Sequence, residues 1–245
     1  MSDATVTWPD LADDGAYERA LGTLAAVTDA LLDDVKTLDD DAVRRPSRCE
    51  GWTRAHVLTH LARNADALGN LLEWARTGVE KPAYAPGARD ADIERGAGRT
   101  ASELESDLDA SSERFLAAVA DLPVDRRHRE VSLRPGVVRP AHEVLWWRIR
   151  EVAYHHVDLA TGRSFLLLPD WIVARGLDEA ATRMTEAGAP GVTLDAHDTG
   201  QRLGVSGGGP AVTGTAGDLL AWITGRDDDP ALESDRALPL LPSWG

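Results

Sequence analysis

The chain is poor in cysteine and has no long apolar run, and each scarcity excludes a class of protein. Cys49 is the only cysteine among 245 residues, so no disulfide can form within the chain and nothing indicates an oxidising compartment. No apolar run approaches the ~20 residues that a membrane-spanning helix requires. The N-terminal sequence also lacks the basic and apolar regions of a signal peptide. We therefore expect a cytoplasmic protein with no membrane association.

Basic residues are scarce as well, with 26 against 41 acidic residues and a formal net charge of -15. Such a field repels nucleic acid and anionic membranes, so we expect neither as a partner. Hydrophobic residues make up 43% of the chain, which is enough for packed cores, and the length suits two domains. We expect a monomer. An anionic small molecule would need a metal ion or fixed arginines to overcome the negative field.

The first two thirds of the chain have the apolar periodicity of long helices, predicted over residues 17–37, 53–77, 100–121 and 140–161. Thr53 suits the N-cap of the second helix, and Gly78 suits its end. The proline- and glycine-rich segment 78–98 is predicted to be a loop, too long for a plain connector and therefore a candidate lid. Four such helices predict a four-helix bundle.

After Pro169 the pattern changes to shorter elements. It predicts a helix over 171–187, strands over 191–195, 202–205 and 211–214, a turn at 207–210, and a last helix over 216–224. We therefore predict an α+β protein with a four-helix bundle over residues 1–165 and a small α+β domain over residues 166–245.

Several histidines fall on the second and fourth predicted helices. On a helical wheel His60 lies at the edge of the apolar face of its helix, whereas His56 points further toward solvent. Glu151 and His155 are four residues apart and share a face of a helix that is apolar almost all round. A carboxylate in such surroundings needs a partner.

A bundle can bring two facing helices close enough for His60, Glu151 and His155 to meet. Two imidazoles and one carboxylate, with a fourth position open, form a catalytic zinc arrangement. Two alternatives stay open at this point. A buried ion-pair network uses the same residue types, and His156 could ligate a metal in place of His155.

The residues around these positions resemble a known family. The segment Gly51-Trp52-Thr53-Arg54-Ala55-His56-Val57-Leu58-Thr59-His60-Leu61 is similar to the metal-site helix of mycothiol-dependent maleylpyruvate isomerases, a branch of the DinB-like metalloprotein superfamily. The similarity returns at Arg150-Glu151-Val152, His155 and Val157-Asp158-Leu159, and more thinly at Trp222-Ile223-Thr224-Gly225-Arg226. The family's two histidines and one glutamate fall on His60, Glu151 and His155.

The resemblance implies an isomerase that converts maleylpyruvate to fumarylpyruvate, with mycothiol and zinc or another divalent metal as cofactors. Rotation about a double bond is blocked, but a thiolate that adds to the bond, allows rotation and is then expelled gives the trans isomer. A metal-bound thiol is deprotonated, so the metal would supply the thiolate. Cys49 lies in a predicted turn with no obvious base, and we expect it to be structural.

A dicarboxylate substrate needs fixed cations, and arginine binds a carboxylate with two parallel hydrogen bonds. The resemblance points to Arg89 in the long loop for the substrate and to Arg226 at the end of the last helix for the substrate or the thiol. Their alternative interpretations are a solvated loop charge for Arg89 and a helix-dipole cation beside Asp227-Asp228-Asp229 for Arg226. Trp52, Trp74, Trp146 and Trp147 could line a pocket, although tryptophan is more typical of a core.

Two other functions fit the same residues. A mycothiol S-transferase would share metal and thiol but leave the thiol attached to its product. A metal-dependent sensor without catalysis is the second alternative, although such proteins tend to hold their metal with several cysteines.

Overall fold

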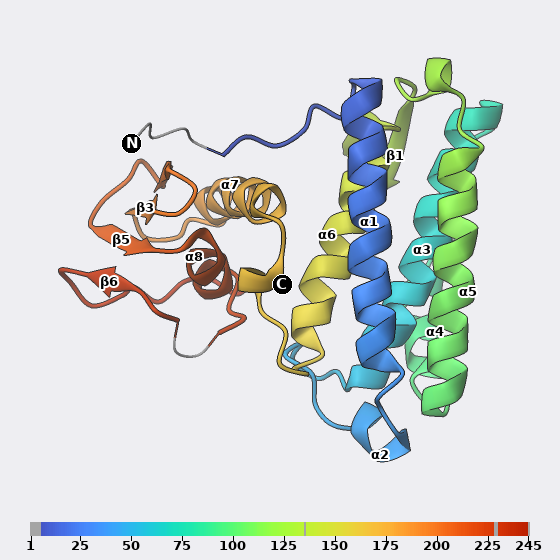
Figure 1. Cartoon of the computed structure of the whole chain (residues 1–245), viewed down its shortest axis with the longest axis horizontal. Helices are drawn as coiled ribbons and strands as arrows, with labels where there is room; N and C mark the ends of the chain where they lie inside the picture. The colour runs from blue at the N-terminus through green and yellow to red at the C-terminus, as the bar shows by residue number, and fades with distance from the viewer. Residues whose placement is uncertain (1–5, 135, 228–229, 245) are drawn as a thin grey trace. The chain divides into compact units, whose positions relative to one another are not determined.

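Four long helices pack side by side in the first part of the chain (Figure 1). The computed structural model describes residues 6–134, 136–227 and 230–244, which divide into two units. One is Pro9–Thr161, and the other comprises the described residues of Met1–Trp8 and Gly162–Gly245. In the first unit, α3 packs against α5 and α6, and α1 packs against the same two helices. This ring confirms the predicted bundle, whose helices are α1 (Asp14–Val35), α3 (Arg54–Thr77), α5 (Ala101–Ala120) and α6 (Glu143–Asp158).

Local capping fixes where these helices begin and end. Thr100 and Glu103 form a reciprocal capping box at the start of α5. Helix α3 begins directly after Thr53 and ends at Gly78, whose φ of 78° lies in the left-handed region that glycine adopts without strain. The predicted boundaries of α3 are therefore confirmed.

The segment 78–98 is not a plain loop, and that prediction was wrong. It contains the helix α4 (Ala88–Gly96), which packs against α3. Only Ile93 and Gly96 of α4 are buried, so the helix lacks the apolar periodicity that would reveal it. A Cβ atom on Gly96 would lie 2.3 Å from Cγ2 of Thr59, so the close approach of the two helices requires glycine at this position.

The fourth long helix also begins later than predicted. Residues before it form an antiparallel hairpin of β1 (Glu130–Arg134) and β2 (Val137–Pro140), which was not predicted. Short helical turns, α2 (Asp40–Val43) and η1 (Val124–Arg126), complete the connections.

The second unit is a small mixed sheet with helices, as predicted. Strand β3 pairs antiparallel with β4 and parallel with β5, which in turn pairs antiparallel with the short strand β6. Helices α7 and α8 pack against each other and against strands of the sheet (Figure 1). The elements are η2 (Phe165–Leu167), α7 (Asp170–Glu186), β3 (Val192–Ala196), β4 (Gln201–Val205), β5 (Ala211–Gly214), α8 (Ala216–Ile223) and β6 (Glu233–Ser234). The α+β prediction is confirmed.

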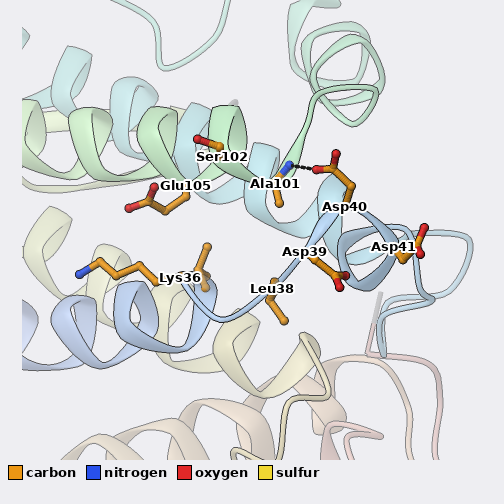
Figure 2. Close-up of a pocket in the computed structure, with 9 residues that line it drawn as sticks. Lys36, Leu38, Asp39, Asp40, Asp41, Ala101, Ser102 and Glu105 are labelled. Atoms are coloured by element: carbon orange, nitrogen blue, oxygen red, sulfur yellow. Dashed lines mark hydrogen bonds between the residues drawn. The ribbon is translucent and has the colours of Figure 1, made fainter.

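Figure 2 shows a surface pocket where the end of α1, α2 and the start of α5 meet. Its polar lining is mostly acidic, and Asp40 has a structural role there, because its Oδ1 accepts a hydrogen bond from the backbone N–H of Ala101 at 2.7 Å. None of the predicted metal-binding or anion-binding residues lines this pocket. Among the described residues, no helix combines the length and apolar character needed to cross a bilayer.

Candidate metal centre

The three predicted metal ligands lie together inside the bundle. Helix α3 carries His60, and the adjoining α6 carries Glu151 and His155. Oε2 of Glu151 lies 2.9 Å from Nε2 of His60 and 3.6 Å from Nε2 of His155. One ligand atom from each residue lies within 4.8 Å of the others. The Nε2 atoms of His60 and His155 therefore both approach the same carboxylate oxygen of Glu151.

The two alternative histidines point elsewhere. Nδ1 of His56 accepts a hydrogen bond from the backbone N–H of Thr53 at 3.2 Å, and its Nε2 lies 3.3 Å from a carboxylate oxygen of Glu94 on α4. His56 is thus half-buried between two helices rather than directed to solvent. His156 lies 2.8 Å from Oδ2 of Asp34 on α1. Each of these histidines has a partner of its own away from Glu151.

Burial and hydrogen bonding push the pKa values of the three residues in different directions. Burial lowers the pKa of His60, and the hydrogen bond to Glu151 offsets only part of this effect. Burial alone would raise the pKa of Glu151, but hydrogen bonds from His155 and His60 hold it well below its ordinary value. Burial alone would lower the pKa of His155, but hydrogen bonds with Asp158, Cys49 and Glu151 raise it well above its ordinary value. These shifts favour an ionised Glu151 and a charged His155.

Two residues beside His155 were not predicted as part of the site. Nδ1 of His155 lies 2.8 Å from Oδ2 of Asp158, which is only 1% exposed. The thiol of Cys49 donates to the same oxygen at 3.3 Å, and its sulfur lies 3.9 Å from Nδ1 of His155. The expectation that Cys49 has no base nearby was wrong, because the turn at residue 49 folds back onto the end of α6.

An aromatic and a cationic side chain lie on the α4 side of the cluster. The Trp52 ring is 5.5 Å from the His60 ring, and the Arg89 guanidinium lies 5.9 Å from the centre of the Trp52 ring. Arg89 also forms an ion pair with its neighbour Asp90 at 2.7 Å. Burial, together with the charge of Glu151, raises the pKa of the Tyr84 hydroxyl to about 12, against the opposing effect of Arg89. No pattern in the sequence indicated that Tyr84 would lie near the site.

Arg226, Trp146 and Trp147 are also among the residues that the sequence suggested for the site. Arg226 directly follows the end of α8 in the second unit, and it is buried, with Nη1 donating to the carbonyl of Thr224 at 3.4 Å. This bond to the helix end agrees with the interpretation of Arg226 as a cation at the end of the last helix. Asp228 and Asp229 lie outside the described residues. Trp146 and Trp147 are buried core residues.

Comparison with known proteins agrees with this arrangement. Residues 24–160 match the model of the mycothiol maleylpyruvate isomerase N-terminal domain. The chain belongs to the mycothiol maleylpyruvate isomerase family. A crystal structure of the mycothiol-dependent maleylpyruvate isomerase superposes with a TM-score of 0.87 at 31% identity, covering 93% of this chain and 97% of that one. A histidine-to-alanine mutant of the isomerase superposes with the same score and coverage at 30% identity.

The match to these isomerase structures extends over both units, so the resemblance that was thin in the C-terminal part of the sequence holds for the fold there as well. Comparison with curated proteins gives no match.

Proposed function

We propose that this member of the isomerase family converts maleylpyruvate to fumarylpyruvate with mycothiol, using a divalent metal ion, most simply zinc, held by His60, Glu151 and His155. The observation that carries the proposal is the convergence of two imidazole nitrogens on one carboxylate oxygen, at 2.9 and 3.6 Å. This convergence lies in the part of the chain that matches the isomerase family model.

The residues fit a divalent metal by their chemistry. Two histidines and one glutamate are a ligand set of catalytic zinc sites, which leave a further position for water or substrate. The cluster is buried but not sealed, since side-chain exposure is 5% for His60, 15% for His155 and 24% for Glu151. When bound, the metal would keep the sulfur of a thiol deprotonated at neutral pH.

The rest of the chain supplies binding and orientation. Isomerisation requires the temporary loss of a double bond, which a thiolate co-substrate achieves by adding to one alkene carbon and later leaving from it. The protein must hold the substrate carboxylates while the central bond rotates. Arg89 suits this role because its guanidinium lies over Trp52, beside His60, and is 44% exposed and thus accessible to a ligand.

Arg226 is proposed as a second anion-binding residue, for the substrate or for a polar group of mycothiol. The support is indirect: it is a buried guanidinium in an acidic protein, and it belongs to the segment that resembles the last helix of the family.

The test is an assay of the purified protein with maleylpyruvate, in the presence and absence of mycothiol. Fumarylpyruvate should form only when mycothiol is present, and chelation of the metal should abolish turnover. His60→Ala should lose both metal and activity, while the exposed His128→Ala serves as a matched control that keeps both. A product that retains the thiol would identify an S-transferase instead. Equal turnover without mycothiol would refute the proposal.

A further inference from the structure

The two histidines of the proposed metal centre differ in what holds their second ring nitrogen. Nδ1 of His155 lies 2.8 Å from Oδ2 of Asp158. Nδ1 of His60 is buried and has no hydrogen-bond partner among the described residues. Among the described residues, therefore, a carboxylate contacts Nδ1 of His155 but not Nδ1 of His60.

The position of Asp158 is fixed by its place in α6 and by two hydrogen bonds. It is the last residue of α6, one turn after His155, so the helix places both side chains on one face. Its carbonyl accepts a hydrogen bond from the backbone N–H of Arg48 at 2.8 Å, and its Oδ2 accepts one from the Cys49 thiol at 3.3 Å. The Asp158 side chain is 2% exposed, so water competes little for these bonds.

A neutral imidazole carries one proton and one lone pair, and a carboxylate can only accept. A carboxylate at Nδ1 therefore keeps the proton on Nδ1 and leaves the lone pair on Nε2. In this structure Nε2 of His155 is the nitrogen that faces Glu151, at 3.6 Å. The tautomer that Asp158 favours is the one that can donate an electron pair to a metal at that position.

We propose that Asp158 is a positioning residue that fixes the tautomer and ring orientation of His155 for metal binding, with the Cys49 thiol holding the carboxylate. This inference rests on the metal centre proposed above. It also gives Cys49 a role other than that of a nucleophile, as a donor to the carboxylate behind the ligand.

Asp158→Asn is the sharpest perturbation because it keeps the size of the side chain and removes the charge. The asparagine amide can donate to Nδ1, which would move the ring proton to Nε2 and block the metal-binding nitrogen. Loss of such a partner lowers metal affinity by about 10- to 100-fold. Asp34→Asn is the matched control, since it removes the carboxylate 2.8 Å from His156, the neighbouring histidine of α6, which faces α1.

The experiment measures the zinc dissociation constant of each protein by competition with a chromophoric chelator. Asp158→Asn should bind zinc at least ~10-fold more weakly than wild type, and Asp34→Asn should match wild type. Wild-type affinity in Asp158→Asn would overturn the inference while leaving the metal centre intact. Absence of zinc binding by the wild-type protein would overturn the metal centre, and the inference with it.

A second measurement does not depend on whether the variant folds. Nitrogen-15 correlation spectra of the zinc-loaded wild-type protein report which ring nitrogen of His155 carries a proton. We expect the proton on Nδ1 and the metal on Nε2. A proton on Nε2, with the metal on Nδ1, would overturn the assignment of Asp158.

Discussion

Zinc binding to the metal-free protein should release one proton, and His155 should be its source. The pKa of His155 is raised well above 6.5, so this ring is protonated at pH 6. The pKa of His60 is lowered, so that ring is neutral, and Glu151 is already ionised because its pKa lies well below 4.5. A metal binds only the deprotonated forms of these ligands. One proton must therefore leave, and we expect it to come from His155, whose pKa its hydrogen-bond partners raise.

The stoichiometry sets the size of the effect. While the pH stays below the pKa of His155, zinc affinity should rise about tenfold for each pH unit, which corresponds to about 1.4 kcal/mol. Lowering the pH should weaken binding by the same factor, because protonation of His155 competes with the metal. The Nδ1–H that faces Asp158 should stay in place throughout.

Titration calorimetry at pH 6, in two buffers of different ionisation enthalpy, counts the released protons directly. At this pH a zinc-bound water with a pKa of about 7 keeps its protons and does not confuse the count. His155→Gln should release no proton, whereas His60→Gln should still release one, although both bind zinc more weakly. Release of no proton or of two protons by the wild-type protein would refute the assignment of charge within the cluster.

Three further outcomes follow from the same site. In the protein without bound metal, the lowered pKa of Glu151 contributes stability that is present above pH 4.5 and is lost as the pH falls through the folded-state pKa of Glu151. The raised pKa of His155 contributes stability that is complete below pH 6.5 and is lost as the pH rises through the folded-state pKa of His155. The urea midpoint of chelator-treated protein should therefore decline on the alkaline side, and a steady increase there would contradict this. Cys49→Ser should keep thiol-dependent turnover, because serine retains a hydroxyl donor; a folded but inactive variant would show that the nucleophile is not borrowed. Arg89→Ala and Arg226→Ala should each lower kcat/KM at least ~10-fold at unchanged zinc content, because each variant loses a charge-assisted hydrogen bond to a carboxylate of the ligand. Unaltered kinetics in either variant would show that the substituted arginine is not part of the proposed site.

The bundle was predictable from sequence because its long helices each present a continuous apolar stripe to the others. Helix α4 was not, since only Ile93 and Gly96 of its residues are buried and the remainder is polar. The β1–β2 hairpin was missed for a different reason. Its strands have five and four residues, too short to show an alternating pattern next to a strongly apolar helix.

The residues of the site also fall into those that the sequence predicted and those that it did not. Helical wheels single out His60, Glu151 and His155 because all three interrupt or border apolar faces. Asp158 ends its helix, where an acidic residue resembles an ordinary solvated terminus. Its contact with Cys49 joins residues 109 positions apart, and no local pattern encodes such a contact.

Gly96 would allow the proposed substrate-binding side of the site to change in evolution separately from the proposed metal centre. Its lack of a side chain lets α4 rest against Thr59, the residue before His60, and α4 carries Arg89. A Cβ atom at position 96 would lie 2.3 Å from Cγ2 of Thr59, so a larger residue requires either that side chain or α4 to shift, whereas Glu151 and His155 lie on α6. We expect selection on a library at this position to yield variants with altered substrate preference that still bind metal, so that new specificities would arise without changes to the proposed metal ligands.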